Sequence, residues 1–108
     1  MKHAKKALDI LWELSVKRRD HYRCKVCGSE GTDAHHILSR RNSGVRWMLD
    51  NGITLCRECH VKATDKRIVF EVSNDIRAAS RVICKFSKDD FDRLRKMFKK
   101  YLAQPGVE

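Results

Sequence analysis

The sequence has no long apolar run. No stretch approaches the roughly 20 apolar residues that a membrane-spanning helix needs. The N-terminus starts with basic residues, as a signal peptide does, but Asp9 and Glu13 interrupt the apolar segment that would have to follow. Internal repeats and low-complexity linkers are also missing. We therefore expect one cytoplasmic, intracellular domain over residues 1–108, with no membrane partner.

Acidic residues are scarce. The chain holds 24 Lys and Arg against 14 Asp and Glu, a formal net charge of +10. This excess favours a polyanionic partner, with nucleic acid ahead of an anionic membrane surface. A basic protein that its charge merely keeps dispersed is the alternative. Acidic residues are absent between Asp33 and Asp50, where Arg40, Arg41 and Arg46 occur. We interpret this segment as a track for DNA phosphates.

The chain has five cysteines, which is an odd number. Four of the five cysteines form two Cys-x-x-Cys pairs: Cys24, Cys27, Cys56 and Cys59. Thiolates from two such pairs can close a tetrahedral structural Zn²⁺ site, and a chain this short gains from a metal staple. Reduced, buried cysteines without metal are the alternative. Cys84 has no paired partner, and we expect it to be a small core residue.

Three histidines accompany the cysteine pairs, and a purely structural zinc site does not need them. His35 and His36 are adjacent in an expected strand over 34–38, so they should point to opposite faces. His60 falls in the first turn of a helix expected from Cys56 to about Thr64. Imidazoles with free coordination positions, beside a neutral imidazole and a basic surface, suit metal-assisted phosphodiester hydrolysis. Any one of them alone would be explained equally well as a zinc ligand or a surface histidine.

The periodicity of apolar residues predicts an α+β fold. Residues 4–18 form an amphipathic pattern whose apolar side, including Leu8 and Trp12, should face the core. Asn51-Gly52 predicts a hairpin turn before a return strand over 53–55. Together with the cysteine pairs, this predicts a zinc-stabilised ββα module over about 22–66, flanked by an N-terminal helix and a C-terminal extension over about 67–108.

The C-terminal extension is less well defined. Residues 68–72 are expected to be extended, and residues 81–86 fit a strand or a helix end equally well. Ser87 and Asp90 predict a capping box at the start of a last helix over about 88–102.

The residues from about 22 to 64 resemble the HNH endonucleases, also called ββα-metal or His-Me finger nucleases. The similarity lies in the first Cys-x-x-Cys, an Ala-His-His-Ile segment and an Asp-Asn-Gly-Ile-Thr-Leu-Cys-x-x-Cys-His segment, in that order. It implies a metal-dependent endonuclease that nicks or cuts DNA, using Mg²⁺, Mn²⁺ or Ni²⁺ beside the structural Zn²⁺.

The resemblance also implies roles for individual residues. His36 matches the general base, and His35 and His60 match ligands of the catalytic metal. Asn51 matches the asparagine that orients the base and steadies the loop. In regular strand geometry Asp33 lies one residue too far upstream to match an acidic ligand found in other members, though a bulge could bring it into that position. Some members carry a further histidine where this chain has Thr64, and either of two nearby lysines is a candidate replacement. The residues expected to contact DNA are Arg40, Arg41, Arg46, Lys62 and Lys66.

Two alternatives remain open. The first is a non-catalytic zinc-ribbon module that binds DNA. The second is a nuclease-like subunit of a larger phage or repair complex, active only with a partner protein. A chain of 108 residues has little room for a separate DNA-reading domain, which favours dependence on a homodimer or a partner.

Overall fold

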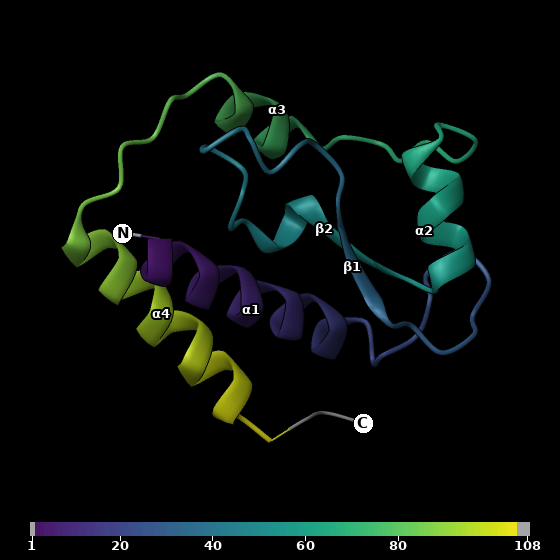
Figure 1. Cartoon of the computed structure of the whole chain (residues 1–108), viewed down its shortest axis with the longest axis horizontal. Coiled ribbons are helices and arrows are strands. Elements are labelled where there is room, and N and C mark those ends of the chain that lie inside the picture. The colour runs from purple at the N-terminus through teal and green to yellow at the C-terminus, as the bar shows by residue number, and fades with distance from the viewer. Residues whose placement is uncertain (1, 106–108) are drawn as a thin grey trace.

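The computed structural model describes residues 2–105 (Figure 1). Its elements are, in chain order, α1 (Lys2–Arg19), β1 (Asp33–His36), the 3-10 turn η1 (Leu49–Asn51), β2 (Gly52–Leu55), α2 (Arg57–Thr64), α3 (Asn74–Ser80) and α4 (Lys88–Ala103). None of the helices within residues 2–105 has the length and apolar character that a membrane crossing requires.

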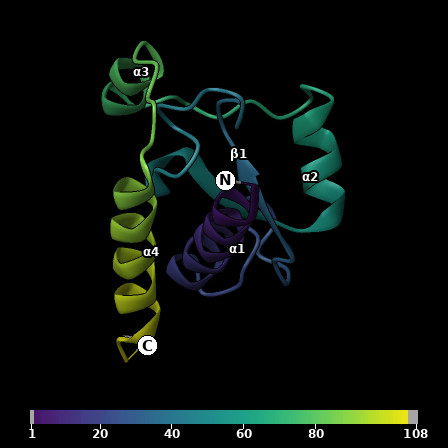
Figure 2. The same cartoon turned by 60° about the vertical axis from the view of Figure 1, so that its left-hand side comes forward.

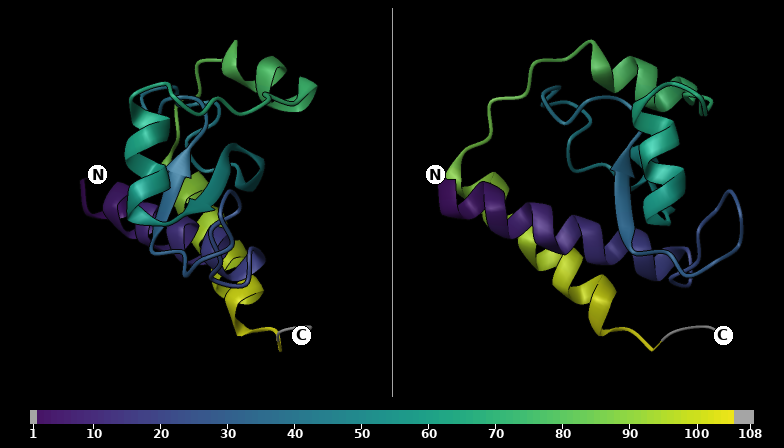
Figure 3. Two further views of the ribbon diagram at one scale, coloured as in Figure 1. Left: turned by 90° about the vertical axis from the view of Figure 1, so that its right-hand side faces the viewer. Right: turned by 45° about the vertical axis from the view of Figure 1, so that its right-hand side comes forward.

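A ββα unit forms the centre of the molecule. β1 and β2 pair antiparallel, with Asp33 opposite Leu55 and His36 opposite Gly52. α2 begins directly after β2, where the Cys56 side chain caps the helix by accepting from the Cys59 backbone N–H. The right-hand view of Figure 3 shows α2 running beside β1. The predicted α+β class and the zinc-type ββα module are therefore confirmed.

The hairpin turn predicted at Asn51-Gly52 is wrong. Gly52 is the first residue of β2 and is extended, with φ −119° and ψ 146°. The tight turns favoured by Asn-Gly need positive φ, which neither residue adopts. The two strands are joined instead by a long loop, residues 37–48, followed by η1. Asn51 ends η1 because its side chain is fully buried and bonded to that loop.

α1 and α4 supply most of the larger of the two buried apolar clusters. Leu8, Trp12 and Val16 of α1 are buried in one cluster with Phe91 and Phe98 of α4. Figures 1 and 2 show the two helices side by side, with α2 on the opposite side of the strands. The predicted core side of the N-terminal helix is thus confirmed.

The Arg18 guanidinium holds the C-terminal end of α4 against α1. It donates to the backbone carbonyls of Tyr101, Leu102 and Gln104. The last carbonyls of a helix have no partner within the helix and carry partial negative charge. A cationic donor at this end therefore satisfies exposed acceptors and favours the helix dipole.

The C-terminal extension has less regular structure than its apolar residues suggested. Residues 68–72 form no strand, and residues 81–86, which we call the strap, are neither strand nor helix. The capping box at the start of α4 is confirmed, with both Ser87 and Asp90 bonding to each other's backbone N–H groups. Cys84 lies half-buried in the strap and outside both core clusters, so the prediction of a core residue is wrong.

The strap and α3 are tied to the loop over residues 37–48, which we call the basic loop. The Asn42 side-chain amide donates to the Ser80 carbonyl at 2.7 Å, and the Cys84 N–H donates to Ser43 Oγ at 2.9 Å. Gly44 lies so close to α3 that a Cβ there would be 2.0 Å from the Ala79 carbonyl oxygen. The extension therefore supports the loop that carries the three arginines.

Gly52→Ala should destabilise the protein. A Cβ at this position would lie 2.5 Å from Val16 Cγ2 and 2.7 Å from Trp12 Cζ2, so α1 would have to move away from β2. Overpacking of this kind costs roughly 1–3 kcal/mol, which urea unfolding would measure. Without the clash, the substitution would instead raise the free energy of unfolding by about 0.4–1 kcal/mol, because alanine lowers the conformational entropy of the unfolded chain. An unchanged or raised unfolding midpoint would therefore contradict the close packing of α1.

Candidate functional site

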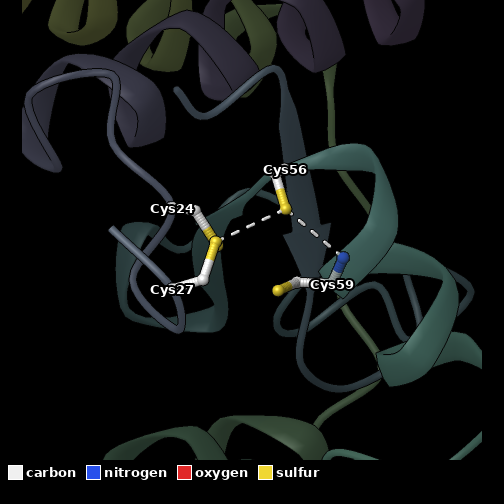
Figure 4. Close-up of side chains that lie close together, drawn as sticks. All are labelled: Cys24, Cys27, Cys56 and Cys59. Carbon is white, nitrogen blue, oxygen red and sulfur yellow. Dashed lines mark hydrogen bonds between the residues drawn. The ribbon is translucent and has the colours of Figure 1, made fainter. Parts of the chain in front are cut away.

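The four paired cysteines converge on one point. Their sulfur atoms all lie within 4.8 Å of one another, although they come from two segments of the chain (Figure 4). The Sγ atoms of Cys27 and Cys56 are 3.7 Å apart. A tetrahedral Zn²⁺ with Zn–S bonds of about 2.3 Å separates its sulfurs by about 3.8 Å. The four-cysteine cluster therefore fits a structural zinc site.

The electrostatics of the cluster agree with a bound cation. Burial raises the pKa of Cys24, but backbone N–H groups of Cys27, Cys56 and Val26 outweigh it and lower the pKa to about 6. The Cys59 backbone N–H lowers the pKa of Cys56 at the start of α2. Burial and the neighbouring thiols raise the pKa of Cys59 to about 12. The pKa is thus lowered for two of the thiols and raised for Cys59, so a bound divalent cation would be needed to hold Cys59 as a thiolate at neutral pH.

His35 and His36 face opposite sides of β1, as predicted from strand geometry. The His36 ring stacks on Trp12 of α1, with ring centroids 3.8 Å apart and an interplanar angle of 9°. The His35 ring faces α2, where its centroid lies 5.1 Å from that of His60. The two histidines therefore have different neighbours and can serve different purposes.

A backbone carbonyl fixes the tautomer of His36. Nε2 lies 3.0 Å from the Arg46 carbonyl oxygen, which can only accept a hydrogen bond. Nε2 therefore carries the proton, and Nδ1 keeps a free lone pair. Burial lowers the pKa of His36, and the hydrogen bond to Arg46 only partly opposes this. A neutral imidazole with one basic nitrogen available is what proton abstraction requires.

His60 is oriented by Asp33 rather than standing alone. Asp33 Oδ2 lies 2.8 Å from His60 Nδ1, and the Arg57 guanidinium contacts the same carboxylate. Burial raises the pKa of Asp33, but these two hydrogen bonds outweigh it and keep the pKa below 3.8. β1 is regular through Asp33, so no bulge brings this residue to the position next to His36. A carboxylate behind a histidine is the arrangement that orients metal-binding imidazoles and leaves Nε2 for the ion.

His35 is available as a neutral ligand. Burial, followed by the nearby His60, His36 and Lys66, lowers its pKa to about 4. With His60 it gives two imidazoles on the same side of β1. Within residues 2–105, only the four cysteines bring three or more His, Cys, Asp or Glu ligand atoms together. With only two imidazoles from the protein, an ion bound here keeps positions for water or phosphate, and imidazole ligands suit Ni²⁺ better than Mg²⁺, which prefers oxygen ligands.

Asn51 holds the basic loop without touching His36 through its side chain. Its Oδ1 accepts from the Leu38 N–H at 2.8 Å, while Nδ2 donates to the carbonyls of Leu38 and Val45 at 3.0 and 3.2 Å. These contacts fix the backbone on both sides of the arginines. Arg46, whose carbonyl bonds His36, directly follows Val45, so Asn51 positions the histidine indirectly.

The five residues predicted to contact DNA differ in their surroundings. Arg40, Arg41 and Lys66 are exposed. Arg46 instead pairs with Asp9 at 2.7 Å, and Lys62 lies 3.5 Å from Glu58. The Thr64 hydroxyl donates to the His60 carbonyl at 3.0 Å and is used within α2. Because Lys66 is close enough to lower the pKa of His35, it is better placed than Lys62 to approach a phosphate there.

Sequence reasoning missed two residues of the site. Trp12 was expected only in the core, yet its ring supports His36 and its Nε1–H donates to the Met48 carbonyl at 2.9 Å. Asp33 was considered only as a possible metal ligand. The Asp-x-His-His spacing on one strand puts Asp33 and His35 on the same face and was the signal that could have linked Asp33 to the metal side.

Residues 24–66 match the model of the HNH endonuclease family. They form an HNH domain. The matched region contains the four cysteines, both strands, α2, and His35, His36, Asn51 and His60. α1, α3 and α4 lie outside it. No curated protein and no solved structure matches the chain. The HNH domain relates the protein to nucleases and makes DNA the expected substrate of the family's chemistry.

Removal of one zinc ligand should unfold the HNH domain. Purified protein should contain about one Zn²⁺ per chain, held by the four thiolates. Cys24→Ser should lose that zinc and unfold or aggregate, because metal binding and folding are coupled in sites of this kind. Cys84→Ser, in the strap, should keep both zinc and the thermal unfolding transition.

Metal analysis by mass spectrometry and circular dichroism would check these outcomes. Well-folded wild-type protein without zinc, or a Cys24→Ser protein with an unchanged transition, would contradict a structural role for the cluster.

Proposed function

We propose that this protein is a metal-dependent endonuclease that hydrolyses phosphodiester bonds in DNA, by nicking or by double-strand cleavage. The observation that carries the proposal is the separation of tasks across β1. One histidine has a fixed tautomer and a free nitrogen, and the other faces a second imidazole that a carboxylate orients. A purely structural zinc domain requires neither arrangement.

His36 acts as the general base in this proposal. Its Nδ1 takes a proton from the attacking water, while Nε2–H remains bonded to the Arg46 carbonyl. The Trp12 ring beneath it restricts rotation of the imidazole, so the free nitrogen keeps one direction. Orientation and the correct protonation state are the two requirements for efficient proton transfer.

His35 and His60 hold the catalytic divalent ion, which supplies Lewis-acid stabilisation of charge on the phosphate and the leaving oxygen. Asp33 fixes the His60 ring so that Nε2 remains free for the ion. The low pKa of His35 keeps its lone pair available at neutral pH. Mg²⁺, Mn²⁺ and Ni²⁺ are the candidates for this position.

Exposed cations position the DNA backbone. Arg40 and Arg41 present two guanidinium groups from the basic loop, and Lys66 presents an ammonium group beside the histidine pair. Arg46 contributes mainly through its carbonyl and its ion pair with Asp9. Lys62 adds charge on α2, reduced by its contact with Glu58. Such contacts bind backbone phosphates without reading sequence.

Thr64 favours a second candidate function. Its position is where some HNH enzymes place a further histidine, and its hydroxyl is bonded to the helix backbone. Without that histidine, the site has one group fewer to contact the scissile phosphate. A DNA-binding, nuclease-like subunit that a partner protein activates is therefore the alternative, and it predicts nicking only when that partner is added.

His36→Ala should abolish most of the cleavage activity while sparing DNA binding. Loss of a general base typically lowers a rate by roughly 10²–10⁴. Plasmid nicking with added Mg²⁺, Mn²⁺ or Ni²⁺ would measure it, and added imidazole should restore part of the rate by replacing the missing ring. His3→Ala, which removes an exposed histidine on α1, is the matched control and should cleave normally.

Zinc content and thermal unfolding of the His36→Ala protein must match wild type for the comparison to count. Near-normal cleavage by that variant would refute the role of His36. A wild-type protein that binds DNA but never nicks it with any of the three metals would favour the partner-dependent alternative.

The rate of cleavage should fall as the pH drops below 6.5. His36 must be neutral to accept a proton, and burial lowers its pKa from 6.5. As the pH falls through this lowered pKa, the protonated fraction rises and activity is lost, so the half-maximal rate should lie below pH 6.5. A pH–rate profile at saturating Mn²⁺, with zinc content measured at each pH, tests this. A half-maximal rate above pH 6.5 would contradict the buried, neutral base.

A further inference from the structure

A pocket of about 310 Å³ lies between the basic loop, the N-terminal part of α1 and the strap. Its volume is at the lower end of the roughly 300–1,000 Å³ that ligand pockets span. Part of its wall comes from residues outside the HNH domain, since Lys5 belongs to α1 and Lys85 and Phe86 belong to the strap. The HNH domain alone therefore does not form it.

The wall of the pocket is strongly cationic and contains no acidic side chain. Lys5, Arg40, Arg41, Arg46 and Lys85 line it. Some cations elsewhere on the protein are neutralised in pairs such as Arg57–Asp33, Arg67–Asp65 and Arg95–Asp92. In the pocket only Arg46 is paired, with Asp9. Across residues 2–105, the other four cations form no ion pair. Four uncompensated charges around one concavity favour a phosphate-bearing ligand.

The floor of the pocket is aromatic. Phe86 is half-buried and packs against Trp47 and Phe91, with ring centroids 5.0 and 5.7 Å away. Aromatic rings beside cationic side chains are the combination that binds single-stranded nucleic acid, because the bases stack and the phosphates pair. The one neutral hydroxyl of the wall, Ser43 Oγ, already accepts from the Cys84 N–H. The wall therefore has few free hydrogen-bonding side chains that could distinguish one base from another.

The pocket adjoins the proposed catalytic histidine. Arg46 lines the pocket, and its carbonyl accepts from His36 Nε2. The pocket and the proposed base are thus linked through one residue, Arg46, along which a strand bound at His36 could reach the pocket. A paired and stacked base cannot enter, since it would first have to leave the duplex. A base at a single-stranded end, gap or overhang is already unpaired, so it enters the pocket at little cost in free energy.

We infer that this pocket binds one unpaired nucleotide of the DNA substrate, next to the bond that is cut. The base lies on Phe86, and its phosphate lies among Lys5, Arg40, Arg41 and Lys85. The inference rests on the proposed function, because it names the DNA structure that the same site prefers. The protein would thus select DNA ends, gaps or overhangs with little preference for the base itself.

The test compares DNA binding in a His36→Ala background, which keeps the DNA intact. Fluorescence anisotropy with Mg²⁺ would measure the affinity for a blunt duplex and for the same duplex with a three-nucleotide 5′ or 3′ overhang. At least one overhang should bind roughly fivefold or more tightly than the blunt duplex, as expected from stacking of one base. Equal affinity for all three duplexes would overturn the inference.

Three variants test whether the overhang preference belongs to the pocket. Lys5→Gln with Lys85→Gln should abolish the overhang preference, while Lys25→Gln with Lys99→Gln removes the same charge outside the pocket and should retain it. Phe86→Leu keeps an apolar floor but removes the ring, and should reduce the preference. A preference that survives the first pair, or that the control pair removes equally, would overturn the assignment.

A further binding measurement tests whether the pocket binds a nucleotide within a DNA strand or a free nucleotide. Deoxyadenosine 5′-monophosphate alone should bind weakly, because no described group reads its base and only one ring supports it. Micromolar binding without an overhang preference would overturn the inference in favour of a free nucleotide. These readouts are independent of cleavage. Nicking without overhang preference would refute only this inference, and overhang preference without nicking would refute only the catalytic proposal.

Discussion

The hydrogen bonds of the buried Asn51 amide are the constraint on which the rest of the site depends. Two strands of four residues cannot by themselves define the long loop between them, and this amide ties both ends of the basic loop to η1. The carbonyl of Arg46 then meets His36 because its neighbour Val45 is held. Loss of these hydrogen bonds would lower the free energy of unfolding by about 1–3 kcal/mol for each buried polar group left without a partner. A residue that does not contact the ring of His36 therefore helps to position it indirectly.

Much of the HNH domain could be predicted because its chemistry is local. The two cysteine pairs, the alternation across β1 and the helix after Cys56 each follow from spacing within a few residues. The Asn51-Gly52 turn was wrong because a buried polar side chain outweighed local turn propensity. Residues 68–72 and 81–86 were poorly predicted because Ile68, Phe70 and Phe86 pack against the core clusters while Val69, Val82 and Ile83 are exposed, so neither stretch joins a sheet. Trp12 could not be assigned to the site, because a ring stacked on a histidine and one in a core give the same sequence pattern.

The pocket beside the basic loop was beyond prediction for a related reason. Lys5, Arg41 and Lys85 come from three separate parts of the chain and share no motif. The contacts of Asn42, Ser43 and Gly44 with α3 and the strap bring Arg41 and Lys85 together, and the Arg46–Asp9 pair ties the loop to α1. The segments outside the HNH domain thus do more than extend it. They complete its core, support the loop after β1 and add a cationic wall next to the histidine.

The stack of His36 on Trp12 changes character when the imidazole gains a proton. The neutral rings pack as two aromatic planes, but an imidazolium in the same place becomes a cation over the face of an indole. Such cation–π contacts stabilise the charged form by about 0.5–2 kcal/mol, the upper end applying when water is excluded. α1 would thus favour the positive ring for as long as it holds a proton taken from water. A helix outside the HNH domain contributes in this way to the charge balance of the reaction.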